Sequence, residues 1–217
     1  MQQNNIVAKE SHKEVYWLLP NLIGYLRIFL GVSAFCICFT HPYWFTFLYG
    51  SSQLLDSIDG YLARRLNKVT TYGAMLDMVL DRASTAALLV ILTHFYPAYI
   101  KFIISLMLLD IISHFLHIYS ALLYGRKSHK AIANNNHYLL KLYYGNSKIV
   151  LALLCIGSEA CLLWFYLQHF GIFITPCLIP QLLQKIIVSA LTFLYLAKQV
   201  VNIIQLKEAV KDIRLLG

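Results

Sequence analysis

The 217-residue sequence predicts an all-α integral membrane protein with six transmembrane helices, and three observations favour this fold class. Hydrophobic residues make up 59% of the chain and charged residues 13%, with a mean hydropathy of +0.63. Apolar runs of about 20 residues recur along the chain, and a helix of that length crosses the hydrocarbon core of a bilayer. Lys and Arg gather in alternate connections between these runs. Together these patterns exclude an ordinary soluble domain.

Six spans are predicted by interrupting the apolar windows at proline, glycine and charged residues. Their ranges are about 20–39, 42–66, 74–95, 98–124, 147–170 and 180–204, within one membrane-embedded domain over residues 1–217. The first 15 residues lack an apolar run, so we expect no cleavable signal peptide. Residues 125–146 form a basic, His-rich and Asn-rich loop in which an interfacial helix is expected at about 137–144.

The positive charges predict the orientation of the spans. With both termini in the cytosol, 14 of the 18 Lys and Arg lie on the cytosolic side, and only Lys101 and Lys185 on the other. Arg27 and Arg82 fall within spans. Because positive residues favour the cytosolic side, this topology is consistent with an even number of spans. The net charge of +8 is therefore mainly a topology signal that also suits anionic lipid headgroups, and it requires no nucleic acid.

Aspartates inside the second and third spans form the most informative pattern. Five of the six aspartates lie in predicted spans, where each charge costs about 2.5–3.5 kcal/mol at the bilayer centre. In the second span, one helical stripe at i, i+3, i+4, i+7 and i+8 contains Asp56, Asp59, Gly60, Ala63 and Arg64. In the third, a stripe at i, i+4 and i+8 contains Gly73, Asp77 and Asp81. Because the linker is short, the two helices are expected to be antiparallel neighbours, with all four carboxylates together at their cytosolic ends.

Four neighbouring carboxylates repel one another, and two divalent cations would neutralise them. Oxygen ligands suit Mg²⁺ or Mn²⁺ better than zinc. A two-metal carboxylate site stabilises the attacking and leaving oxygens of an in-line phosphoryl displacement. Gly60 and Ala63 would leave room for a bulky ligand, and Arg64 would donate to a phosphate. The alternatives are structural ion pairs with arginines in or beside the spans, or a cation pathway, but neither requires these small residues and this arginine.

The full pattern, Asp56-x-x-Asp59-Gly60-x-x-Ala63-Arg64, eight residues, then Gly73-x-x-x-Asp77-x-x-x-Asp81, resembles the signature of the CDP-alcohol phosphotransferases. The segments "PNLIGYLRIFL", "YGAMLDMVLDR", "LDIISHFLH" and "GRKSHK" are similar to the eukaryotic members of that family that use inositol. The resemblance implies the family's six-helix fold, commonly a homodimer, in the endoplasmic reticulum membrane with its polar site open to the cytosol. It also implies transfer of the phosphatidyl group from CDP-diacylglycerol to myo-inositol with release of CMP.

The resemblance further assigns expected roles to residues of the motif. The expected ligands of a Mg²⁺ or Mn²⁺ pair are Asp56, Asp59, Asp77 and Asp81, with Asp81 also the general base. The expected contacts to the CDP moiety are Gly60, Arg64 and Thr70.

The residues that select the acceptor alcohol are predicted less directly. One polar stripe of the fourth span contains Asp110, Ser113, His114 and His117, which would bind inositol hydroxyls, support the metal site or join helices. In the basic loop, Lys130 and His129 are candidates for a phosphate or inositol, or they are solvated polar groups. In the first span, Arg27 would pair with a carboxylate or phosphate near the site, or form a structural ion pair. Asn21 is expected to cap that span.

Other functions are left open by the sequence. The acceptor could be glycerol phosphate, serine or choline, and a metal-dependent membrane prenyltransferase is a more distant possibility. A cation transporter would be expected to place its acidic residues near the midplane of discontinuous helices. Here the aspartates lie near the ends of the predicted spans.

Overall fold

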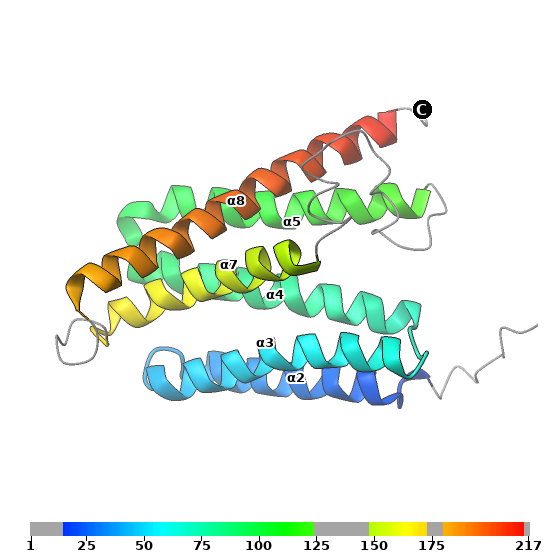
Figure 1. Cartoon of the computed structure of the whole chain (residues 1–217), viewed down its shortest axis with the longest axis horizontal. Helices are drawn as coiled ribbons and strands as arrows, with labels where there is room; N and C mark the ends of the chain where they lie inside the picture. Colours follow the sequence, from blue (N-terminus) through cyan, green and yellow to red (C-terminus); the bar gives the residue numbers. More distant parts are fainter. Residues whose placement is uncertain (1–14, 124–147, 173–179, 215–217) are drawn as a thin grey trace, which may run out of the picture. The chain divides into compact units, whose positions relative to one another are not determined.

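The computed structural model describes residues 15–123, 148–172 and 180–214 and contains helices but no strands within these ranges. The α-helices are α2 (Leu19–Ile37), α3 (Pro42–Arg65), α4 (Thr71–Phe95), α5 (Ile100–Leu123), α7 (Lys148–His169) and α8 (Gln181–Arg214) (Figure 1). A short 3-10 helix, η1 (Pro97–Tyr99), precedes α5. The prediction of an all-α fold is confirmed, and a helix lies at each of the six predicted spans. The interfacial helix expected at 137–144 lies outside the described ranges.

Within the described ranges, three helical segments have the length and apolar composition needed to cross a membrane: Leu19–Ile37, Pro97–Leu123 and Gln181–Arg214. The apolar stretch of α3 is interrupted by its own acidic and basic residues, so a crossing by α3, and likewise by α4 and α7, stays a prediction. At about 1.5 Å per residue, the 34 residues of α8 measure about 51 Å, well beyond the ~30 Å hydrocarbon core. The sixth span was predicted to end at 204 because hydropathy falls there, but the helix itself continues to Arg214.

The distribution of side chains is the reverse of that in a soluble protein. Phe29, Phe115 and Phe193 are 68%, 66% and 71% exposed, whereas Arg27 and Gln205 are 2% and 1% exposed. Soluble monomers rarely expose apolar surface of this extent, because water penalises it. The apolar helices thus indicate a membrane protein.

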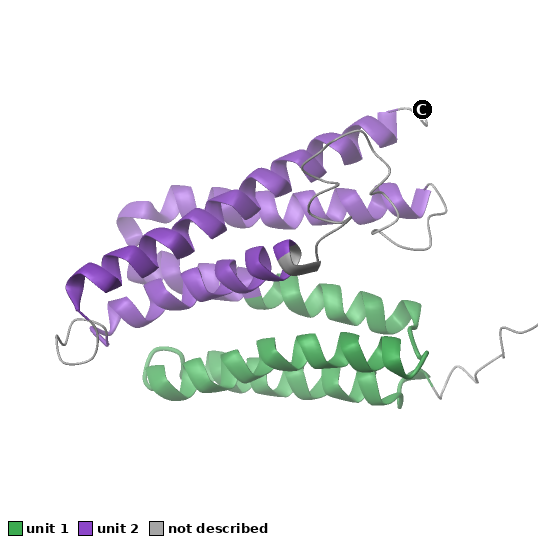
Figure 2. Cartoon of the chain, viewed as in Figure 1, with its two compact units in different colours: residues 1–84 green, residues 85–217 purple. Residues whose placement is uncertain are grey.

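The chain forms two compact units, residues 1–84 and 85–217, and the boundary falls within α4 (Figure 2). In the first unit, α2 and α3 pack along one another. Phe35 of α2 contacts Phe45 and Tyr49 of α3, with ring centroids 5.9 Å away in both cases, and the two α3 rings are fully buried. This aromatic contact holds the pair together at the end opposite the aspartates. The single domain over residues 1–217 stays a prediction.

The end of α3 is set by a Schellman turn. The N–H of Lys68 donates to the carbonyl of Ala63 at 2.9 Å, and the N–H of Asn67 donates to that of Arg64 at 3.3 Å. Asn67 has a φ of 53°, in the left-handed region that asparagine tolerates better than most residues. The turn stops α3 and directs the chain into α4 after five residues, so the two aspartate-bearing helices follow one another closely.

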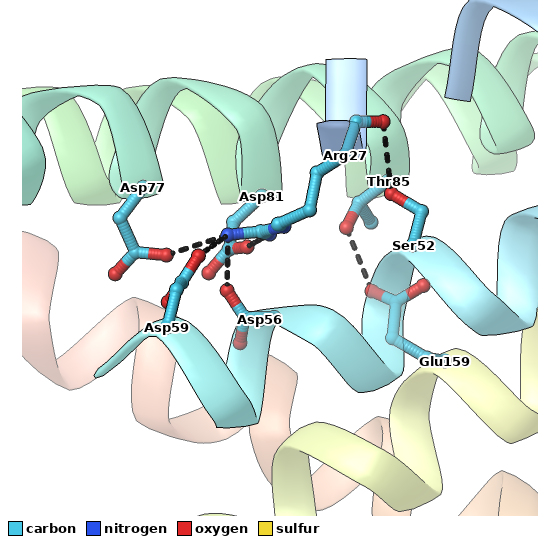
Figure 3. Close-up of polar contacts among 8 residues, drawn as sticks. All are labelled: Arg27, Ser52, Asp56, Asp59, Asp77, Asp81, Thr85 and Glu159. Carbon is cyan, nitrogen blue, oxygen red and sulfur yellow. Dashed lines mark hydrogen bonds and ion pairs between the residues drawn. The ribbon is translucent and has the colours of Figure 1, made fainter. Parts of the chain in front are cut away.

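In the second unit, α8 packs against α5 and α7, and polar groups line part of the α5–α8 contact. Asn202 donates to Asp110 Oδ1 at 3.1 Å and to Gln199 Oε1 at 3.1 Å, while Ser120 donates to Asp212 Oδ2 at 3.4 Å. Elsewhere in this unit, Thr85 Oγ1 of α4 donates to Glu159 of α7 at 2.7 Å (Figure 3). Polar contacts of this kind join helices where no hydrophobic driving force between them operates.

The turn after α3 generates a stability prediction. Asn67→Val should lower the thermal midpoint of the purified protein in detergent, because a β-branched residue at positive φ costs about 1–2 kcal/mol. Asn67→Gly should leave the midpoint unchanged or raise it, since glycine adopts this conformation without strain. Lys68→Val, at the exposed neighbouring position, is the matched control. Equal midpoints for the valine and glycine variants at position 67 would contradict the left-handed turn.

Candidate active site

The four aspartates of α3 and α4 converge on one guanidinium group, that of Arg27 in α2 (Figure 3). Arg27 Nη1 lies 2.6 Å from Asp56 Oδ1, 3.1 Å from Asp59 Oδ2 and 2.9 Å from Asp77 Oδ1. Its Nη2 lies 2.7 Å from Asp81 Oδ1. The two helical stripes therefore do face the same point, and a third helix supplies the positive charge there.

The backbone contacts of the first unit set the register of this cluster. Ser52, one turn before Asp56 in α3, donates to the backbone carbonyl of Arg27 at 3.2 Å and is buried. At Gly24, a side chain would bring its Cβ within 2.8 Å of Leu76 Cδ2, so α4 approaches α2 closely one turn before Arg27. These two contacts hold α3 and α4 against the part of α2 that carries the arginine.

The arginine does not satisfy the cluster fully. Each Nη nitrogen carries two hydrogens. Those of Nη1 bond to Asp59 and Asp77, which leaves the buried Asp56 Oδ1 with an ion pair but no hydrogen bond in the described structure. One guanidinium also balances only one of four carboxylate charges.

The donor set fits a divalent cation. Asp56, Asp59 and Asp77 each offer an oxygen, and these atoms lie within 4.8 Å of one another. Carboxylate oxygens alone are typical ligands of hard cations such as Mg²⁺ and Mn²⁺. The oxygen Oδ1 of Asp56, which has an ion pair but no hydrogen bond in the described structure, is free to bind a metal ion as a ligand. Asp81 joins the cluster through the other nitrogen of the arginine.

Next to the cluster, Arg64 lies over the missing side chain of Gly60. A Cβ at Gly60 would be 3.4 Å from Arg64 Nη1, and Arg64 is exposed. An exposed cation is thus positioned one helical turn beyond Gly60. This placement suits an anionic group approaching the carboxylates from the end of α3, and the CDP contacts predicted for these two residues stay predictions.

Thr70 and Gly73 shape the start of α4. Thr70 Oγ1 accepts a hydrogen bond from the N–H of Gly73 at 3.0 Å, which caps the helix. A Cβ on Gly73 would lie 2.6 Å from Asn21 Oδ1 and 3.1 Å from Thr70 Oγ1. Gly73 therefore permits the close approach of α2 to the first turn of α4.

The prediction that Asn21 caps the first span is wrong. Leu18 is the N-cap of α2 and no side chain caps that end, while Pro20 stands in the first turn. The amide of Asn21 instead donates to the carbonyl of Val15 at 2.6 Å. Because the helix begins before the proline, Asn21 is already inside it.

A family model described as CDP-alcohol phosphatidyltransferase matches residues 17–206, most of the chain. The chain belongs to the CDP-alcohol phosphatidyltransferase family. The match includes all five residues of the charged cluster, and members of the family depend on divalent metal.

Curated relatives within the CDP-alcohol phosphatidyltransferase family share one name. CDP-diacylglycerol--inositol 3-phosphatidyltransferase 1 of Arabidopsis thaliana is 40% identical over 204 residues, which cover 90% of this chain and 88% of the relative. The Saccharomyces cerevisiae enzyme of that name is 37% identical over 215 residues, covering 96% and 91%. The Homo sapiens enzyme is 41% identical over 159 residues, covering 73% and 74%. No solved structure matches the chain at a significant level.

Of the residues predicted to select the acceptor alcohol, Arg27 belongs to the charged cluster of the first unit, whereas those of α5 belong to the second unit. Asp110 and His117 of α5 are each 4% exposed, and Asp110 accepts from Asn202 of α8. His114 Nδ1 lies 2.8 Å from the backbone carbonyl of Asp110 and 3.8 Å from its Oδ1. These contacts agree with a role in joining helices, one of the alternatives from the sequence. His129 and Lys130 lie outside the described residues.

A row of buried polar residues on α8 was missed by the sequence reasoning. It comprises Lys198, Gln199, Asn202, Gln205, Glu208 and Asp212. Most of these recur every three or four residues, the same signal that identified the α3 and α4 stripes. The signal was overlooked because the last two spans were judged on hydropathy alone.

Substitution of Gly73 tests the close approach of α2 and α4. Gly73→Ala should lower the thermal midpoint, because its Cβ would collide with the Asn21 carboxamide, which is already bonded to Val15. The matched control is Gly50→Ala in α3, where no atom of the described structure beyond the adjoining helix backbone lies within 4 Å of the added Cβ. This control should be neutral or stabilising by up to about 1 kcal/mol, since alanine is the better helix former. A Gly73→Ala protein as stable as Gly50→Ala would contradict the packing described here.

Proposed function

We propose that this protein transfers the phosphatidyl group of CDP-diacylglycerol to myo-inositol and releases CMP, forming phosphatidylinositol. The observation that carries the reaction class is the convergence of four signature aspartates on one point between α2, α3 and α4. The choice of inositol rests on the name borne by relatives that are 36–41% identical.

Asp56, Asp59, Asp77 and Asp81 are the proposed ligands of two divalent ions, Mg²⁺ or Mn²⁺. When bound, the ions would neutralise the diphosphate and stabilise charge on the attacking and leaving oxygens. Three of the four aspartates already meet the spacing that a single ion requires, and the excess negative charge of the cluster favours a second cation.

The residues at the α3–α4 turn hold the nucleotide in this proposal. Arg64 donates two hydrogen bonds to diphosphate oxygens, and Gly60 lets that group approach the helix backbone. Thr70 can cap α4 and contact the substrate at once, because a hydroxyl accepts through its lone pairs and still has one proton to donate.

Asp81 accepts the proton of the attacking inositol hydroxyl. The inositol oxygen then bonds to the phosphorus that carries diacylglycerol, the bond from that phosphorus to the bridging oxygen breaks, and CMP leaves. The placement of Asp81 on Nη2, apart from the three aspartates around Nη1, supports this separate role.

The setting of the reaction is part of the proposal. We place the protein in the endoplasmic reticulum membrane as a homodimer, with both termini and the active site facing the cytosol. The concentration of Lys and Arg in alternate connections supports the orientation. A site at the cytosolic ends of α3 and α4 would let the acyl chains stay in the bilayer while inositol arrives from water. Asp110, His114, His117, His129 and Lys130 remain candidates for holding the acceptor.

An acceptor panel tests the function. The purified protein is reconstituted with CDP-diacylglycerol and either Mg²⁺ or Mn²⁺, and CMP release is measured with inositol, glycerol phosphate, serine or choline. Inositol should stimulate release far above the others, and chelation of the metal should abolish it. Equal stimulation by another alcohol would overturn the acceptor, and no CMP with any alcohol would overturn the reaction class.

Replacement of the proposed base tests the mechanism. Asp81→Asn should retain at most a few percent of the wild-type rate, because a carboxamide cannot accept the hydroxyl proton at neutral pH. The thermal midpoint and Mn²⁺ binding of the variant are measured alongside, to separate lost chemistry from lost folding. A folded variant with a substantial rate would show that Asp81 is not the base.

A further inference from the structure

Arg27 Nη1 occupies the place where a cation bound by Asp56, Asp59 and Asp77 would sit. It lies 2.6, 3.1 and 2.9 Å from one oxygen of each of these aspartates. Hard divalent ions bind carboxylate oxygens at about 2.0–2.6 Å, so a metal bound by these same three oxygens would need almost the same position. The nitrogen and the metal cannot both be there.

We propose that Arg27 is a built-in counter-cation that holds the four aspartates together before metal binds and is displaced from three of them by the metal. The inference rests on the proposed metal centre and assigns a new role to a residue outside the signature. Arg27 is a positioning residue in this account. It keeps α3 and α4 docked on α2 before the metal binds.

The hydrogen bonding of Arg27 suits a replaceable group. Its Nε is buried and makes no hydrogen bond in the described part of the chain, and Asp56 Oδ1 is likewise without one. The guanidinium donates hydrogen bonds to Asp59, Asp77 and Asp81, but its fork of five N–H groups is only partly used. If a divalent ion replaced the guanidinium, Asp56 Oδ1 would bind that ion directly.

The contact with Asp81 offers a pivot for this displacement. Asp81 is bound by Nη2 at 2.7 Å, whereas the other three aspartates surround Nη1. Movement of Nη1 away from its three partners can therefore leave the Asp81 bond in place. Arg27 then stays beside the site as a positive group after the metal has taken its ligands.

Mn²⁺ binding to the purified full-length protein, measured by electron paramagnetic resonance without substrate, tests the proposal. Arg27→Gln should bind Mn²⁺ about tenfold more tightly than wild type, because no competitor has to leave. The metal-free Arg27→Gln protein should have a lower thermal midpoint than metal-free wild type. Added Mn²⁺ should raise the midpoint of the variant by more than it raises that of wild type. Arg82→Gln is the matched control, because it removes a positive charge next to Asp81 in the sequence but leaves Arg27 among the four aspartates. Its affinity for Mn²⁺ should change less than that of Arg27→Gln.

A second variant separates displacement from the simple loss of charge. Arg27→Lys keeps the positive charge but replaces the two-nitrogen fork with one ammonium group, so it should bind Mn²⁺ several-fold more tightly than wild type. This variant also keeps the test available if Arg27→Gln does not fold. If the position 27 variants bind Mn²⁺ more weakly than wild type, or no more tightly than Arg82→Gln, the counter-cation role is overturned but the metal centre is not. Absence of Mn²⁺ binding in wild type and both position 27 variants would overturn the metal centre as well.

Discussion

The attraction between Arg27 and four aspartates is the interaction on which the first unit depends. A charged group removed from water is tolerated only when an opposite charge lies close by, and Arg27 is 2% exposed. This requirement restricts three helices at once, because α3 and α4 must each turn a stripe of carboxylates toward the same point of α2. The bond from Ser52 to the Arg27 carbonyl and the close approaches at Gly24 and Gly73 hold the three helices in the register that this restriction requires.

A related constraint shapes the second unit, where a contact between α5 and α8 is lined by polar side chains while large apolar groups face outward. In hydrocarbon, an unpaired amide or carboxylate costs several kcal/mol, so each buried polar side chain must find a partner on a neighbouring helix. Asn202 meets this need by bonding to both Asp110 and Gln199. The bond between Asp110 and Asn202 thus joins α5 to α8 without any ligand.

The sequence predicted much of this because helical spacing and hydropathy are local properties. Apolar windows located the helices, and the i, i+3 and i+4 offsets within α3 and α4 were enough to predict that their carboxylates face one another. Features that depend on a third partner were not predictable in this way. Pairing of Arg27 with a carboxylate near the site was one of the predictions, but its contact with all four aspartates depends on the packing of α2. The left-handed Asn67 depends on how α3 ends. The extent of α8 was underestimated because hydropathy reports where a helix leaves the hydrocarbon, whereas the helix itself continues.

The charge balance of the first unit also bears on how the site would be assembled. With Arg27 alone, four carboxylates retain an excess of negative charge, which repels the diphosphate of a nucleotide lipid. Arg64, which lies over Gly60 at the edge of the cluster, cannot by itself reverse that field. In the proposed enzyme this repulsion favours binding of the divalent ions before the nucleotide or together with it. The bound diphosphate then adds its own negative charge. Because Arg27 is still bonded to Asp81 in the proposed mechanism, its positive charge offsets part of that negative charge. An arginine at this position serves both states of the site, as a substitute for the metal before loading and as a counter-charge to the substrate afterwards.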